Sequence, residues 1–396
     1  MNPPIGSPSP PRWTNRLLVI TFIESFATVC IERGAFFYGE HILKFTMKDN
    51  LLMALAFGLC YVTGALLSHR ATSWLTERKV LISAIIAQAV IHIFMGVHIT
   101  AITLVAGNAI LGLVNGLKWP VVESYITAGL DHVQTSKVVG KFNMSWAGSI
   151  PLAVAAVGFL VELHPSALFL AAGLLNILAL GIAWTLHQQP YHMPEDHPAR
   201  PDPVRLASLK RLMYASRFLL LSSYGLMYVL AASLPYSLKG LGYGIQIATA
   251  LAALMDVARI GAFGSLQRWS GWHDKQWPLW ITVILLPAGF YMTHFAPSTA
   301  MIITGELLFG FTAGIVYYCA LYYAMVAKNA SVEASGAHEG LIGLGFALGP
   351  AAALIGIALA SSLGSELNGT AATTALMILA CSIPACMILL RRGKIT

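Results

Sequence analysis

Apolar residues fill long runs of the chain that short polar segments separate, and they do not alternate with polar residues at a period of two. Twelve of these runs are long enough to cross about 30 Å of hydrocarbon as a helix. Lipid cannot hydrogen-bond the backbone, and no run resembles a barrel strand, so we expect helices. The twelve predicted spans are 17–39, 48–68, 80–98, 100–128, 140–162, 166–187, 211–235, 244–266, 276–295, 299–327, 338–361 and 370–390.

Lys and Arg residues are distributed unevenly among the segments that join these spans. With the N-terminus on the cytoplasmic side, 17 of the 24 basic residues are cytoplasmic, three (Lys44, Lys48 and Lys239) are external, and four lie within spans. An excess of basic residues in cytoplasmic segments is the usual orientation signal. We therefore expect a multi-pass protein of the plasma or inner membrane with both termini in the cytoplasm. The net charge of +7 then reflects topology and contact with anionic membrane lipid, and we expect no nucleic-acid partner.

One pattern of small residues occurs in both halves of the chain. Gly112 and Gly116 align with Gly310 and Gly314 at an offset of 198 residues, which is half of 396. Small residues four apart allow two helix backbones to approach closely inside lipid. Parallel repeats that carry a few buried polar groups are typical of membrane transporters. The pattern predicts an all-α membrane protein made of two six-helix bundles related by pseudo-twofold symmetry.

The segment between the sixth and seventh predicted spans is rich in Pro and His and carries charges of both signs. Such a segment cannot cross lipid, so it predicts a cytoplasmic linker, with a short interfacial helix over 205–211. The predicted organisation is a disordered N-terminal tail at 1–16, a first bundle at 17–187, the linker at 188–210 and a second bundle at 211–391.

Several short motifs, together with the six-plus-six arrangement, resemble those of the major facilitator superfamily. Residues 64–79 are similar to the family's loop between spans two and three, with Ser68 where the family has Asp. Residues 112–120 match its Gly-x-x-x-Gly-x-x-x-Pro pattern in span four. Residues 345–350 resemble the Gly-x-x-x-Gly-Pro element that its antiporters carry in span five. The resemblance implies the twelve-helix fold of this family, with span one lining a central cavity.

The resemblance also implies charges that hold one conformation closed on the cytoplasmic side. Asp256 and Arg259 are three residues apart and can pair on one helix face, and with Arg268 they are similar to the family's charge cluster. Glu123 lies near the cytoplasmic end of span four, where it is either a gate charge or an ordinary helix-end charge. The candidate gating or structural charges are Arg78, Lys79, Glu123, Asp256, Arg259 and Arg268.

Ionisable groups within spans are costly to place in lipid, which makes them candidates for function. Glu24 and Glu32 lie eight residues apart in span one and therefore close to one helix face. Burial favours the protonated form of a carboxyl group, so such groups can carry protons. Glu306 lies inside an apolar span and is the third proton-coupling candidate. The alternative for Glu32 is a permanent pair with a buried base such as Arg33, which would only stabilise the fold.

Polar and aromatic residues near these carboxyl groups are the candidates for substrate binding. Asn108, at the repeat position of Glu306, shares a stripe of span four with Asn115 and Lys118. Lys118 either lines the cavity or extends toward the cytoplasmic surface. A tyrosine offers a flat apolar body and a hydroxyl group, with core packing as the alternative role. The candidates are Thr28, Arg33, Asn108, Asn115, Lys118, Tyr224, Tyr228, Tyr317 and Tyr318.

The sequence has no Gly-rich ATP-binding loop, no zinc-protease motif and no nucleophile elbow. We therefore expect no enzyme activity, no cofactor and no metal site. The pattern predicts a monomeric secondary transporter that moves a small solute by alternating access, coupled to protons. The alternative, suggested by Ser68 in the loop motif, is a membrane scaffold or sensor that has lost transport.

Overall fold

The computed structural model describes residues 13–128, 130, 132–189, 202–327 and 332–391, and every regular element in these residues is a helix. Most of the tail predicted at 1–16, and the middle of the linker predicted at 188–210, lie outside the described residues. Helix α8 begins at Pro203, so residues 205–211 form part of a long helix that continues to Gly240.

The first half of the chain consists of α1 (Trp13–Glu32), α2 (Gly34–His41), α3 (Met47–Trp74), α4 (Glu77–Val97), α5 (Ala101–Thr127), α6 (His132–Leu163) and α7 (Ala167–Ala183). The second half consists of α8 (Pro203–Gly240), α9 (Ile245–Ala252), α10 (Leu254–Arg268), α11 (Trp277–His294), α12 (Thr299–Ala327), α13 (Val332–Ala358), α14 (Ala360–Leu363) and α15 (Glu366–Leu390).

Each predicted span corresponds to one helix or to two consecutive helices. Nine spans in the described part of the chain are long and apolar enough to cross a membrane on length and hydropathy alone, and α1, α7 and α11 complete the set of twelve. Spans one and eight, expected to be continuous, are interrupted at Arg33 and at Ala253. A buried charged residue lies at or near each interruption. Arg33 is buried at the first, and the buried Asp256 follows Ala253 by three residues at the second.

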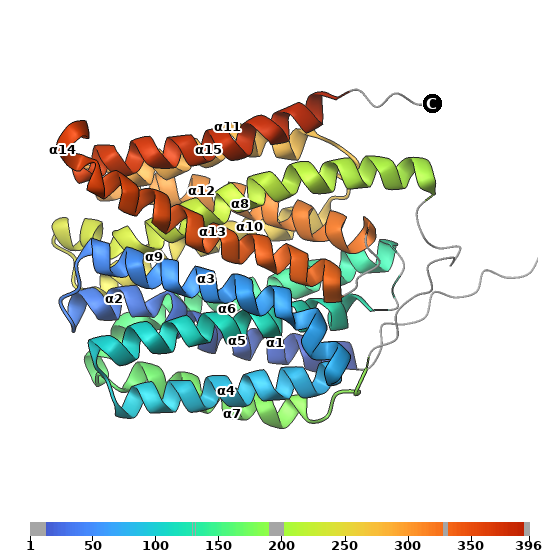
Figure 1. Ribbon diagram of the computed structural model, residues 1–396, viewed down its shortest axis with the longest axis horizontal. Helices are drawn as coiled ribbons and strands as arrows, with labels where there is room; N and C mark the ends of the chain where they lie inside the picture. Colours follow the sequence, from blue (N-terminus) through green and yellow to red (C-terminus); the bar gives the residue numbers. More distant parts are fainter. Residues whose placement is uncertain (1–12, 129, 131, 190–201, 328–331, 392–396) are drawn as a thin grey trace, which may run out of the picture.

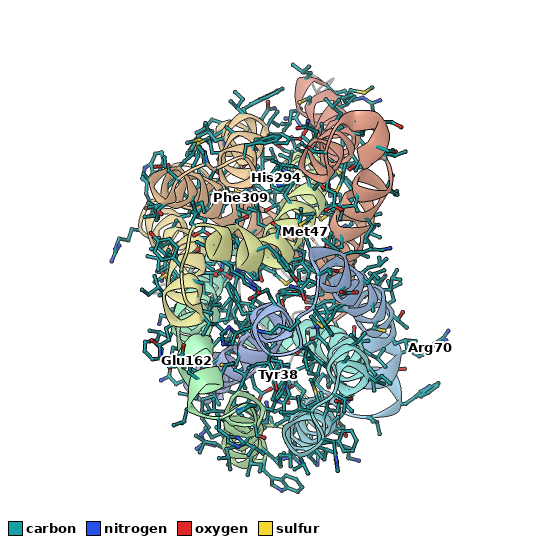
Figure 2. All side chains as sticks on the ribbon, turned by 90° about the vertical axis from the view of Figure 1, so that its left-hand side faces the viewer. Tyr38, Met47, Arg70, Glu162, His294 and Phe309 are labelled. Atoms are coloured by element: carbon teal, nitrogen blue, oxygen red, sulfur yellow. The ribbon has the colours of Figure 1, made fainter. Side chains whose placement is uncertain are left out.

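The spans run back and forth along the long axis of the molecule, and the start of α1 and the end of α15 lie at the same end (Figure 1). We call this the terminal end, and the opposite end, where α2, α9 and α14 lie, the far end. Viewed from the far end, the blue-to-green helices of the first half and the yellow-to-red helices of the second half occupy opposite parts of the bundle (Figure 2). The halves meet where α3 packs against α13 and where α6 packs against α9 and α10.

The repeated glycines allow the same close helix contact in both halves. A Cβ atom at Gly112 of α5 would overlap the backbone oxygen of Phe57 in α3. A Cβ atom at Gly310 of α12 would overlap the backbone oxygen of Met255 in α10. Because glycine has no side chain at either position, α5 can lie directly on α3 and α12 directly on α10. The repeat predicted from the sequence is confirmed by these equivalent contacts.

Replacement of Gly310 with alanine is expected to lower the stability of the purified protein by about 1–3 kcal/mol, the usual cost of an overpacked core. The added methyl group has to move α12 away from α10. Gly148 of α6 is the matched control, because a Cβ atom there meets nothing within 4 Å. Thermal unfolding in detergent measures both variants. Equal melting temperatures for Gly310→Ala and Gly148→Ala would contradict the close packing.

Candidate functional site

A central cavity lies between the two halves, with about 90 Å³ of space for water-sized spheres. One water needs about 10–15 Å³ by this measure, so the cavity has room for several waters or a small solute. Seven of its seventeen lining residues are aromatic: Tyr61, Trp119, Phe142, Trp146, Tyr224, Tyr317 and Phe346. Four lining residues are charged: Glu32 and Arg33 from the first half, and Arg259 and Glu339 from the second.

Contacts between the halves lie on both sides of this cavity. Toward the far end, Lys239 of α8 pairs with Glu40 of α2, and Gln246 of α9 donates a hydrogen bond to Glu162 of α6. Toward the terminal end, Tyr317 of α12 donates to Glu123 Oε1 of α5 at 3.4 Å. Contacts between the halves therefore lie on both sides of the cavity.

Three charged side chains form an ionic group at the centre, where the interruption between α1 and α2 faces α10. Asp256 Oδ1 lies 2.6 Å from Arg259 Nη2, and its Oδ2 lies 3.5 Å from Arg33 Nη1. All three side chains are buried. The guanidinium of Arg259 also lies 4.9 Å from the ring centroid of Trp146, in a cation–π contact. Two arginines and one aspartate leave a surplus of one positive charge beside the cavity.

The other candidate carboxyl groups near the centre differ in their partners. Glu32 lines the cavity and accepts a hydrogen bond from Tyr228 Oη of α8, while its neighbour Arg33 pairs with Asp256. Glu306 is fully buried, and both its carboxyl oxygens lack hydrogen-bond partners among the described residues. The side-chain nitrogen and oxygen of Asn108, at the repeat position of Glu306, also lack them. Glu32 is thus the proton-coupling candidate in direct contact with the cavity.

A second buried polar group lies inside the first half. Lys118 Nζ of α5 lies 2.8 Å from Glu24 Oε2 of α1 and donates to Gln88 Oε1 of α4, also at 2.8 Å. Asn176 of α7 donates to the other oxygen of Glu24 at 2.8 Å. Thr28, which lines the cavity, accepts a weaker bond from Lys118 at 3.3 Å. Glu24 and Lys118 therefore satisfy each other behind the cavity wall.

Asn115 belongs to this second group, since its Oδ1 accepts a hydrogen bond from Gln88 at 2.8 Å. Tyr224 lines the cavity, whereas Tyr318 packs edge-on against Phe263 and Trp272 outside the lining. Tyr317 lines the cavity and its neighbour Tyr318 does not, because consecutive residues of a helix point in different directions.

The predicted gating charges do not lie together. Arg78 Nη1 donates to the backbone oxygen of Leu186 at 2.9 Å, and Lys79 is exposed. Arg268 is exposed at the last residue of α10, about 13.5 Å along the helix from Arg259. Asp256 and Arg259 belong to the central ionic group instead.

A cluster of one histidine and two glutamates lies on the terminal side of the cavity. Glu123 comes from α5, and His338 and Glu339 come from α13. One potential ligand atom from each of the three lies within 4.8 Å of the other two. Tyr61 Oη donates a hydrogen bond to Glu339 Oε2. Carboxylate oxygens and imidazole nitrogens placed in this way can bind a proton or a divalent metal ion.

Sequence reasoning missed several residues of these groups. Gln88 and Asn176 are polar residues inside otherwise apolar runs, and that signal alone could have selected them. Glu339 follows the predicted start of span eleven by one residue, so it resembles an ordinary first-turn carboxylate. Trp146 and Phe346 carry no signal, because aromatic residues that line a cavity have the same sequence pattern as those that pack in a core.

The twelve spans in the described residues, with one cavity between two halves, are the architecture of a multi-pass membrane protein. The family model of the major facilitator superfamily matches residues 38–353, which is more than half of the chain, and the chain belongs to this family. It is therefore a multi-pass integral membrane protein, and membership indicates a transporter of a solute rather than an enzyme.

Solved structures of transporters have the same fold. A bacterial homologue of the human lysosomal transporter Spinster, in an inward-facing and occupied conformation, is 14% identical, with a TM-score of 0.66 and 97% of each chain covered. The human organic anion transporter MFSD10 is 15% identical, with a TM-score of 0.64, covering 96% of this chain and 100% of that one. A mutant of the nucleoside transporter NupG is 14% identical, with a TM-score of 0.66, covering 95% and 100%. No curated protein sequence matches the chain.

Proposed function

We propose that this protein is a secondary active transporter that carries a small organic anion together with a proton by alternating access. The observation that carries the proposal is the central cavity, which both halves line with ionisable groups. Contacts between the halves on either side of the cavity are what a rocking motion would break in turn. Family membership and the fold of the neighbouring structures support transport, whereas the coupling rests on the residues argued below.

The chemistry of the cavity supports a cargo with a flat apolar part and an acidic group. The seven aromatic side chains offer ring faces to an apolar body. Arg33 and Arg259 share the single carboxylate of Asp256, so one positive charge has no fixed partner within that group. Arginine binds carboxylates through paired hydrogen bonds, which makes an organic acid the cargo that fits this surplus.

Glu32 supports the coupling to protons because it lies in the same cavity as the two arginines. When Glu32 is ionised, its charge balances the surplus positive charge, and an anionic cargo gains little by binding. When Glu32 is protonated, the surplus is available to the cargo. Proton and anion would therefore bind together, and the coupling free energy is reciprocal between them.

Three ring compounds of matched shape test the cargo class: benzoate, benzyl alcohol and benzylammonium. We expect benzoate at millimolar concentration to raise the melting temperature of the purified protein more than the other two. The Arg259→Gln variant should lose this preference. Equal shifts for all three compounds would contradict an anionic cargo. The absence of any shift with these and with a wider metabolite library would favour the scaffold or sensor alternative.

The Glu32→Gln variant tests the coupling in proteoliposomes. Glutamine imitates the protonated carboxyl group, so exchange of labelled cargo across the membrane should persist while accumulation driven by a pH gradient is lost. Coupling of about 1–3 kcal/mol corresponds to a loss of about 5- to 150-fold. Glu366→Gln, an exposed carboxylate at the start of α15, is the control. Accumulation by Glu32→Gln that still follows the pH gradient would show that another carboxyl group, such as Glu306, carries the proton.

A further inference from the structure

The cluster of Glu123, His338 and Glu339 contains an imidazole whose polar atoms are unused. His338 is fully buried, and both of its ring nitrogens lack hydrogen-bond partners among the described residues. One oxygen of Glu123 is in the same condition. Buried polar atoms normally have partners, because leaving them without one costs free energy. The three side chains nevertheless place donor atoms within 4.8 Å of one another.

A proton shared between Glu123 and Glu339 would explain the closeness of the two carboxyl groups, but it would leave both nitrogens of His338 without a partner. A divalent transition-metal ion accounts for all three residues, because imidazole nitrogen and carboxylate oxygen are its usual ligands. Two carboxylates also neutralise its charge. We propose that Glu123, His338 and Glu339 form a binding site for a divalent transition-metal ion such as Zn²⁺.

The surrounding contacts match those of a metal site in two respects. Tyr61 Oη holds Glu339, and Tyr317 Oη holds Glu123, as the outer hydrogen bonds that orient metal ligands usually do. Ligand atoms on a tetrahedral zinc ion lie about 3.4 Å apart, so donor atoms that lie within 4.8 Å of one another need to close by at most about 1.4 Å. Glu339 also lines the cavity, so an ion bound here would lie beside it.

The position of the cluster predicts what the ion does. Glu123 belongs to α5 of the first half, and the other two ligands belong to α13 of the second half. An ion bound by all three ties the halves together on the terminal side of the cavity. The site is complete only while the halves touch there, so the ion stabilises that closed arrangement. This inference needs only the fold and the cluster, and it differs from the expectation from the sequence that no metal site exists.

Titration of chelator-treated, full-length protein in detergent with Zn²⁺ and with Co²⁺ tests the site. We expect one Zn²⁺ per chain by calorimetry, a visible absorption band from bound Co²⁺, and a higher melting temperature with Zn²⁺. His338→Gln and Glu123→Gln should each weaken Zn²⁺ affinity by about 100-fold or more, since even losses around the ligands cost about 10- to 100-fold. Affinity that does not change in these variants would overturn the proposal.

His98→Gln is the control for adventitious binding, because His98 is exposed at the end of α4. Its affinity for Zn²⁺ should equal that of the wild type, and an equal loss in both histidine variants would overturn the proposal. X-ray absorption of the Zn²⁺-loaded wild type needs no variant and covers the case in which His338→Gln fails to fold. One imidazole and two carboxylates in the zinc shell support the site, and a shell without imidazole contradicts it. These readouts stand whether or not benzoate is a ligand.

Discussion

Replacement of Lys118 with methionine is expected to destabilise the protein by about 3–5 kcal/mol, which is the usual effect of removing one partner from a buried ion pair. Lys118 and Glu24 are 0% and 1% exposed at the side chain and lie 2.8 Å apart. Without the ammonium group, the carboxylate of Glu24 keeps only the amide of Asn176 as a donor in the described part of the chain. Thermal unfolding of the purified variant in detergent measures the loss.

The double variant Lys118→Met with Glu24→Gln is expected to recover most of this stability, because neither charge is then left alone. Arg205→Ala is the matched control for an ion pair at the surface. Arg205 pairs with Asp274 at 3.4 Å, both side chains are about one-third exposed, and its loss should cost about 0–1 kcal/mol. A double variant no more stable than Lys118→Met would mean that Lys118 stabilises the protein without help from Glu24.

The same pair shows what the sequence can and cannot predict. Glu24 and Lys118 are both charged residues inside apolar spans, and this local signal is enough to single them out. Their partners depend on how α1 and α5 are rotated about their axes, and 94 residues separate the two side chains in the chain. The sequence therefore predicted two separate roles, in proton coupling and in substrate binding, for residues that the structure pairs with each other.

The fold was more predictable than the site, for a physical reason. Membrane spans follow from runs of apolar residues, and the contacts of Gly112 and Gly310 follow from small residues repeated at one offset; both signals are local. The interruption at Arg33 was not predicted, since no Pro or Gly-rich segment precedes it. Arg33 pairs there with Asp256, which lies 223 residues further along the chain.

Within the site, residues that are unusual for a lipid-facing helix could be predicted, and ordinary ones could not. Glu32 and Arg33 lie in the cavity because few other environments tolerate them. Phe346 stacks on Tyr228 with ring centroids 3.8 Å apart and lines the same cavity, yet it is indistinguishable in sequence from a packing residue. Glu339 appeared to be a helix-end charge until α3 and α5 were placed around it.

The second prediction with a large effect concerns Asp256 of the central ionic group. Asp256→Asn is expected to cost about 3–5 kcal/mol in stability and to abolish transport, because Arg33 and Arg259 both lose the only carboxylate that forms an ion pair with them in the described residues. Arg33→Gln should cost less, about 1–3 kcal/mol, because Arg259 still holds Asp256 at 2.6 Å.

Comparison of these two variants separates a role in folding from a role in joining the halves. Arg33 is the only member of the group that comes from the first half, so Arg33→Gln removes the central ion pair between the halves while the pair of Asp256 and Arg259 in the second half stays intact. We therefore expect Arg33→Gln to be well folded but altered in exchange of labelled cargo, and Asp256→Asn to fail in both thermal unfolding and exchange. If Asp256→Asn were instead as stable as Arg33→Gln, another carboxylate would have to balance the two arginines. Glu32, beside Arg33 in the cavity, would then be ionised in the resting protein, and an anion would gain little by binding until Glu32 takes up a proton.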